Sequence, residues 1–173
     1  MFLTMGQVYT HLNIPAGSSM VDEQDLRTFA EAACDAVEQE CGPIEMRTVV
    51  DERVIGSRAA VVLSEFPVTT VVSVSYLGVS GSVSDYRIER LAGVLSRWDG
   101  GVIPDGTLIT YTVGQAIPPS WAVGAAKIIV KHLWRTQRLS RADAQEAVPG
   151  AGFAVPNAAA TLMRGHRLPP GSA

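Results

Sequence analysis

The chain is poor in charged residues, and this shortage narrows what it can do. Charged residues make up 18% of its 173 residues, below the roughly 25% of an ordinary soluble domain. Apolar surface that a monomer cannot bury tends to end in subunit contacts, so the composition favours an oligomer. The formal net charge of -3 argues against a general attraction to nucleic acid, because sequence-independent binding needs clustered cations.

Cysteine and histidine are also scarce, with two and three residues respectively. Cys34 and Cys41 are seven positions apart on one expected helix. Their Cα atoms should lie roughly 10 Å apart, beyond the ~7 Å limit for a disulfide, so we expect free thiols. His11, His132 and His166 are far apart in the sequence and have no partner at metal-ligand spacing. We therefore expect no metal and no cofactor.

No catalytic motif is recognisable. The segment Gly78 to Asp85 reads as a small polar loop and lacks the lysine of a phosphate-binding loop. Asp51 and Glu52 are adjacent, so on a strand they point to opposite faces and form no local carboxylate pair. We therefore expect a protein that is not an enzyme, although a site assembled from distant residues stays open.

Long apolar runs are missing as well. The most apolar long segment, residues 121–134, is interrupted by Lys127 and Lys131, so we expect no membrane span. The start of the chain, MFLTMGQVY, has no basic stretch followed by an apolar run, so we expect no signal peptide. These features predict a soluble protein made in the cytoplasm.

The periodicity of what remains predicts an α+β fold. Helical spacing of apolar residues indicates three helices, over residues 4–12, 22–41 and 120–138. Short segments rich in Val, Ile, Thr and Tyr, separated by turn residues, indicate an antiparallel β-rich insertion over residues 47–113. We expect a small helical bundle, made of the N-terminal helices and a long C-terminal helix, that carries this insertion. Residues 1–138 would form a single domain.

Two helix faces carry charges of opposite sign. The last long helix has a basic stripe made of Lys127, Lys131, Arg135 and Arg138. The second helix has an acidic stripe made of Glu31, Asp35 and Glu38. The stripes are either solvated faces that pair with one another, or an inter-subunit or DNA-facing surface, and the sequence does not separate these alternatives.

Residues 139–173 form a C-terminal extension rich in Ala, Gly and Pro. Phe153, Val155, Leu162 and Met163 are spaced apolar anchors within it, and Pro156 to Arg164 predicts a short helix. An arm with anchors and no core of its own usually orders on a partner, so we favour a docking arm over a loose tail.

The order of several short motifs resembles that of a known family. The chain begins with LTMGQVYTHLNIP and EAACDAVEQECG, continues through EFPVTTVVSVSYLG, SDYRIER, GVLSRWDGG and PDGTLITYTVGQ, and returns to a helix at AAKIIVKHLWRTQR. From about Leu3 to Arg138 this order is similar to that of the head-to-tail connector (adaptor) proteins of tailed double-stranded DNA bacteriophages. Each motif is weak alone, and their order and spacing carry the resemblance.

The resemblance implies a structural role in the virion neck. Such connectors form a ring, commonly of twelve subunits, under the portal protein, and the next neck or tail protein assembles on that ring. DNA passes through without sequence-specific binding. By analogy, the portal-docking arm would use these residues: Phe153, Val155, Pro156, Leu162, Met163 and Arg164. The loop from Gly78 to Asp85 is a candidate for contact with a neighbour or with the next ring. The alternatives are another neck, tail-completion or stopper protein and, less favoured, a small enzyme or ligand-binding module.

Overall fold

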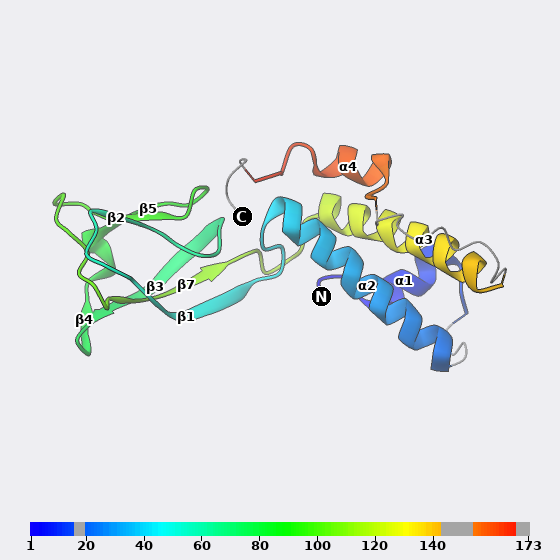
Figure 1. Ribbon diagram of the computed structural model, residues 1–173, viewed down its shortest axis with the longest axis horizontal. Coiled ribbons are helices and arrows are strands. Elements are labelled where there is room, and N and C mark those ends of the chain that lie inside the picture. Colours follow the sequence, from blue (N-terminus) through cyan, green and yellow to red (C-terminus); the bar gives the residue numbers. More distant parts are fainter. Residues whose placement is uncertain (16–19, 143–153, 169–173) are drawn as a thin grey trace. The chain divides into compact units, whose positions relative to one another are not determined.

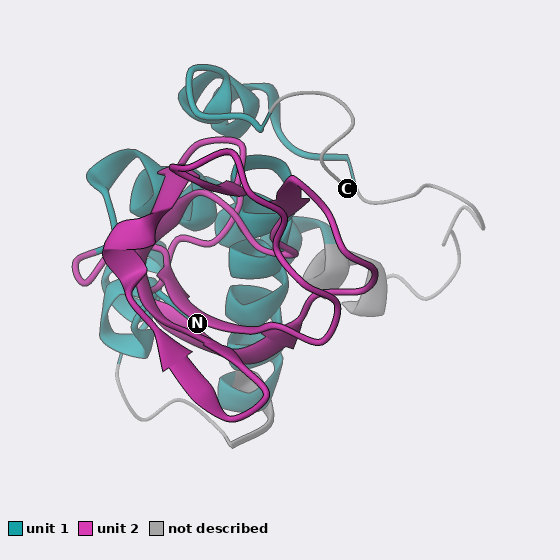
Figure 2. Cartoon of the chain, turned by 90° about the vertical axis from the view of Figure 1, so that its left-hand side faces the viewer, with its two compact units in different colours: residues 1–41, 118–173 teal, residues 42–117 magenta. Residues whose placement is uncertain are grey.

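The computed structural model describes residues 1–15, 20–142 and 154–168, and the side chains of residues 20–22 and 137–142 lie outside that description. The chain divides into two compact units, residues 1–41 with 118–173 and residues 42–117 (Figure 2). One unit is helical and the other is made of strands. The predicted α+β class, a helical bundle with an antiparallel β-rich insertion, is therefore confirmed.

The helical unit contains α1 (Met5–Leu12), α2 (Met20–Cys41), α3 (Ser120–Ala142) and α4 (Asn157–Met163) (Figure 1). Helix α1 begins with a capping box, in which the Thr4 hydroxyl accepts from the Gln7 N–H at 3.3 Å and the Gln7 side chain accepts from the Thr4 N–H at 3.1 Å. Helix α2 ends at Cys41 because Gly42, at φ 78°, and Pro43 follow it. Among the described residues, no helix has the length and apolar character needed to cross a membrane.

Small and aliphatic side chains fill the core between these helices. The buried apolar residues are Phe2, Leu3, Val8, Leu26, Ala30, Ala33, Cys34, Val37, Cys41, Ala122, Ala125, Ala126, Ile129, Val130, Leu133, Ala159 and Met163. Six of them are alanines, which let α2, α3 and α4 approach one another closely. The two cysteines are free and buried, as expected.

The β unit contains two antiparallel sheets. The strands are β1 (Arg47–Arg53), β2 (Ala60–Val62), β3 (Val68–Tyr76), β4 (Val79–Gly81), β5 (Tyr86–Glu89), β6 (Val94–Arg97) and β7 (Leu108–Val113). The larger sheet has the order β1-β7-β3-β4 and the smaller one β2-β6-β5. Strand β4 and a 3-10 turn, Val83–Asp85, occupy the segment that we expected to be a loop, because Val79 to Gly81 pairs with the end of β3.

Tyr111 connects the strands of the larger sheet to the segment before β3. Its side chain is fully buried, and its hydroxyl donates to the Glu52 carboxylate and accepts from the Glu65 N–H at 3.1 Å. Glu52 in turn accepts from the Ser64 hydroxyl at 2.8 Å. Burial, and then the bond to Glu52, raise the pKa of Tyr111 to about 12.

Candidate interaction surfaces

The basic stripe lies on α3 next to α1. Lys127 and Lys131 are partly exposed and Arg135 is exposed, whereas the side chain of Arg138 lies outside the described residues. Helix α3 contains five Lys or Arg residues and no Asp or Glu. Its positive charge is therefore not balanced within the helix.

A broad polar depression of about 590 Å³ adjoins this stripe, and its lining residues are Thr4, Gly6, Gln7, Thr10, His11 and Lys127. The Nε2 atom of His11 is buried and has no hydrogen-bond partner in the described part of the chain. Burial, followed by the charges of Lys131 and Lys127, lowers the pKa of His11. Lys127 lines the depression and Lys131 lies close enough to act on His11, so the depression is an electropositive surface, which suits an acidic partner.

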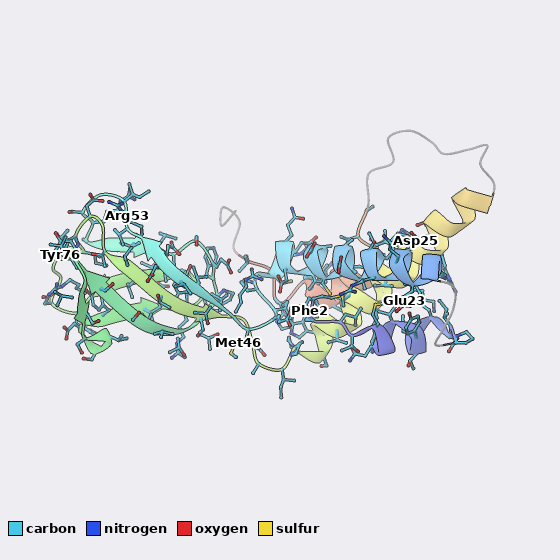
Figure 3. All side chains as sticks on the ribbon, turned by 90° about the horizontal axis from the view of Figure 1, so that it is seen from below. Phe2, Glu23, Asp25, Met46, Arg53 and Tyr76 are labelled. Carbon is cyan, nitrogen blue, oxygen red and sulfur yellow. The ribbon has the colours of Figure 1, made fainter. Side chains whose placement is uncertain are left out.

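The acidic stripe lies on the outer face of α2. Glu31 and Asp35 are exposed, and Glu38 is partly exposed. Glu31 makes an ion pair with Arg27 one turn earlier, at 3.4 Å between Nε and Oε1. In Figure 3, α2 runs along the upper side of the helical unit and α1 along the lower side. The acidic stripe and the depression therefore belong to different helices, because α2 carries the stripe and α1 carries most of the residues that line the depression.

The end of the described chain packs against the helical unit of its own subunit. The Leu168 N–H donates to the Glu40 carbonyl at 3.0 Å, and Arg167 Nε lies 2.7 Å from a Glu40 carboxylate oxygen. The rings of Trp121 and His166 are stacked, with centroids 4.0 Å apart and an angle of 4° between the planes. These contacts involve α2 and α3, so the segment has a defined place on the chain itself.

The six predicted docking residues differ in exposure. Met163 is fully buried, Leu162 is 40% exposed and Arg164 is exposed. Val155 and Pro156 are partly exposed, and Phe153 lies outside the described residues. Because the Met163 side chain belongs to the core of its own subunit, Leu162 and Arg164 are the predicted docking residues that stay exposed near the end of α4.

The β unit exposes many large apolar side chains, a feature that sequence reasoning did not single out. They are Met46, Val50, Ile55, Val62, Val72, Tyr76, Leu77, Val79, Leu91, Trp98, Val102 and Ile117. Exposure of so many apolar groups on a small unit is typical of a surface that meets another protein. Arg87 lies over the ring of Trp98, 5.8 Å from its centroid, and Trp and Arg are residues enriched in such interfaces.

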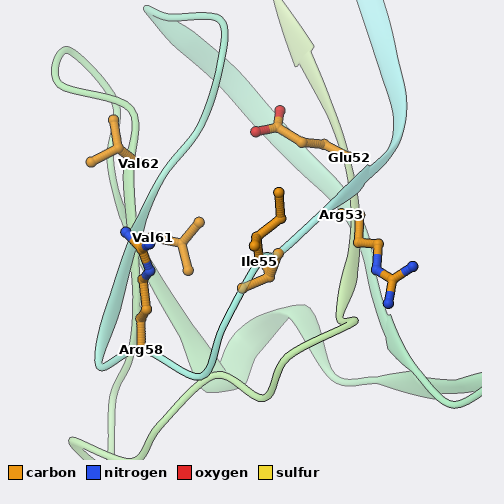
Figure 4. Close-up of a pocket in the computed structure, with 7 residues that line it drawn as sticks. Glu52, Arg53, Ile55, Arg58, Val61 and Val62 are labelled. Atoms are coloured by element: carbon orange, nitrogen blue, oxygen red, sulfur yellow. The ribbon is translucent and has the colours of Figure 1, made fainter.

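A small hollow opens beside the end of β1. Its volume is about 210 Å³, and it is lined by Glu52, Arg53, Val54, Ile55, Arg58, Val61 and Val62. Figure 4 shows Ile55 and Val61 pointing into the same space. Among the described residues, no group of three or more His, Cys, Asp or Glu side chains is arranged to hold a metal ion.

Comparison with known proteins relates the whole chain to one kind of particle. No protein-family model matches the chain, and no curated protein matches it. A solved chain from the neck of an empty gene transfer agent particle, computed with C6 symmetry, matches with a TM-score of 0.63 and 17% identity over 97% of this chain and 90% of that chain. A chain from the virion of a native gene transfer agent particle matches with a TM-score of 0.59 and 16% identity, over 99% of this chain and 94% of that chain. At this identity the likeness shows a shared fold.

Proposed function

We propose that this protein is a structural component of the neck of a phage-like particle, and more narrowly a head-to-tail adaptor that forms a ring under the portal. The observation that carries the proposal is the structural likeness to the neck chain, because it extends over 97% of this chain and 90% of that one. The independent resemblance of motifs from Leu3 to Arg138 to head-to-tail connectors supports the same role. In this role the protein acts by binding other proteins and has no catalytic activity.

The ring would be closed by the two charged faces of the helical unit. A ring needs a heterologous interface, in which two different surfaces of one subunit meet their counterparts on its neighbours. The acidic stripe on α2 and the basic stripe with the adjoining depression are two such surfaces of opposite sign.

We propose a ring of twelve subunits. The neck in which the similar chain occurs was computed with C6 symmetry. Six-fold symmetry fits a ring of six and also a ring of twelve, because a twelve-fold axis contains a six-fold one. DNA would pass through the ring without sequence-specific binding, and the net charge of -3 fits a channel that does not hold it.

The C-terminal extension, residues 139–173, would engage the portal protein. Leu162 and Arg164 are exposed at the end of α4, while Met163 anchors that helix in its own subunit. An anchored helix presents its outer side chains in a fixed position, which lowers the entropic cost of docking. The remaining surface of the ring would receive the next neck or tail protein.

A second candidate is another neck protein, of the tail-completion or stopper type. Such proteins are usually dominated by a small β-barrel. The division of this chain into two units, one of them made of strands, keeps this alternative open. The long helices α2 and α3 favour the adaptor.

The decisive experiment adds the purified protein to DNA-filled, tailless capsids and images the portal vertex by cryo-electron microscopy. A ring below the portal is the expected result, and a ring attached elsewhere in the tail would favour the second candidate. Simple truncation after Arg138 is a poor test of the arm, because it removes the buried Ala159 and Met163. The double variant Leu162→Asp, Arg164→Glu tests portal docking while it keeps the buried Ala159 and Met163, and Thr161→Ser on the same helix is its control.

The inter-subunit role of the stripes has its own test. Variant A is Lys127→Glu with Lys131→Glu, and variant B is Glu31→Lys with Asp35→Lys. Each variant alone would place like charges at every contact, so neither should form a ring. An equimolar mixture restores opposite charges in a ring that alternates A and B, which closes for any even number of subunits. A basic stripe that faces DNA instead would leave variant B assembling normally by itself.

A further inference from the structure

The turn between β3 and β4 contains a leucine, Leu77, that has a positive φ and an exposed apolar side chain. Tyr76 pairs with Val79, so Leu77 and Gly78 form a two-residue hairpin turn, with φ values of 51° and 77°. Turns with two positive φ values prefer Asn-Gly, because a bulky side chain is strained in the left-handed region. Leu77 is nevertheless there, and its side chain is 81% exposed. Strain and apolar exposure at one position indicate a functional constraint.

The surroundings of Leu77 form an apolar projection, which we call the hairpin tip: Tyr76, Leu77, Gly78 and Val79. Val79 is 71% exposed and Tyr76 is 41% exposed. The chain has no charged residue over the 19 positions from Phe66 to Ser84. An edge hairpin without any charge lacks the usual protection against association. The hairpin tip is therefore built to enter an apolar site on another molecule.

The same unit offers such a site in the hollow beside β1 (Figure 4). Four of its lining residues are apolar, Val54, Ile55, Val61 and Val62, and Ile55 and Val62 are 78% and 65% exposed. Its volume of about 210 Å³ exceeds the roughly 150 Å³ that accommodates a benzene-sized apolar group. A leucine side chain fits that space, and the charged groups at its rim can bind the Tyr76 hydroxyl.

The hairpin tip and the hollow lie at the same end of the larger sheet and at its opposite edges. In the register of this sheet, Arg53 of β1 pairs with Leu108 of β7, which pairs with Ser75 of β3. Strand β1 forms one edge and β4 the other, so three strand spacings, about 14 Å, separate them. Two copies can therefore join side by side, because the projection on one edge of the sheet lies at the same level as the recess on the other edge.

We propose that the hairpin tip of one copy inserts into the Ile55 hollow of the next copy of this chain. The proposal rests on the proposed ring, since this contact is head-to-tail and uses a different surface on each partner. The tip is small beside the roughly 1,200 Å² that a stable interface buries. It therefore adds to the contact made by the helical units and does not hold two copies together alone.

Cysteine cross-linking tests the pairing directly. The native thiols will not interfere, because Cys34 and Cys41 are buried and burial raises the pKa of each. Leu77→Cys and Ile55→Cys chains that carry tags of different size are mixed, assembled on tailless capsids and oxidised. A covalent pair containing one chain of each kind is expected. Within one chain the two positions are too far apart for a disulfide.

The matched control replaces Ile55→Cys by Ile117→Cys, which is 82% exposed and follows the opposite end of β7. It should give no cross-link with Leu77→Cys. Rings that form without the Leu77–Ile55 cross-link, or that give only Leu77–Leu77 pairs, would overturn the proposal. A failure to form any ring would instead count against the proposed function, so the two failures are distinguishable.

The variant Leu77→Asn separates docking from folding. Asparagine accepts the positive φ, so the free subunit should melt at the same or a higher temperature. The concentration for half-maximal ring occupancy should rise about tenfold for each 1.4 kcal/mol lost per contact. Leu91→Asn, at a side chain that is 74% exposed, is the control and should change neither quantity. Unchanged ring occupancy for Leu77→Asn would refute the proposal that the hairpin tip inserts into the next copy.

Discussion

Replacing Met163 by alanine tests whether the C-terminal segment belongs to the fold of the free subunit. Met163 is fully buried, the Cys41 thiol lies 3.9 Å from its carbonyl oxygen, and α4 packs on α3. Truncating a buried methionine to alanine costs about 2–5 kcal/mol, because the transfer free energy and a cavity term add. We expect a loss of this size in the free energy of unfolding. This loss cannot exceed the free energy with which α4 docks on the rest of the helical unit, because a terminal segment can detach before the rest unfolds.

Leu162→Ala is the matched control, because it also removes three heavy atoms from the same helix. Leu162 is 40% exposed, so its loss should cost about 1 kcal/mol. Urea unfolding measures both losses, and hydrogen exchange of residues 157–168 reports whether α4 detaches separately. Equal effects of the two substitutions, with exchange unprotected in the parent protein, would refute the conclusion that Met163 is a core residue of the free subunit.

Three further predictions concern residues in the interior and in the depression. Tyr111→Phe should lower the unfolding free energy by about 1–3 kcal/mol, because Glu52 loses a buried donor. Folding raises the pKa of Tyr111 from 10 to about 12, so the parent protein should lose stability as pH rises from 10 to 12. Urea titrations should show that the variant lacks this loss. Gly114→Ala should be far more destabilising than Gly56→Ala in thermal melts, because both have positive φ but only the methyl at 114 would lie 2.3 Å from the Glu45 carbonyl oxygen. Folding lowers the pKa of His11, so stability should fall as pH drops below about 6.5, and the unfolding of His11→Gln at pH 5 and 7 should lack that part of the loss.

Local signals made the helices predictable, because caps and breakers act within a few residues. Thr4 and Gln7 form the cap that begins α1, and Gly42 with Pro43 ends α2 at Cys41. The fold class could be predicted because the helical spacing of apolar residues and the short segments rich in Val, Ile, Thr and Tyr are also local patterns. The order β1-β7-β3-β4 could not, because β7 inserts between strands that precede it and this pairing depends on long-range packing.

The candidate surfaces were less accessible to sequence reasoning. The charged stripes are visible in the periodicity, but the proximity of His11 to Lys127 depends on how α1 packs on α3. The packing of Met163 in its own subunit had no signal in an Ala-, Gly- and Pro-rich segment, since small residues fit many partners equally well. Leu77 was hidden for another reason: a leucine before a glycine indicates nothing until the φ values and the Tyr76–Val79 pair are known.

The few charged residues of the chain are distributed unevenly among its helices and strands. Helix α3 is wholly basic in its charges, and α2 carries the acidic stripe, so the helical unit concentrates charge of each sign on separate faces. Strands β3, β4 and β7 carry no charged residue at all. Charge pairing directs encounter and selects the partner, whereas apolar insertion slows dissociation once the partner is placed. The ring that we propose would have to close with one register and then withstand the passage of DNA, which needs both properties, and in this proposal each unit of the chain supplies one of them.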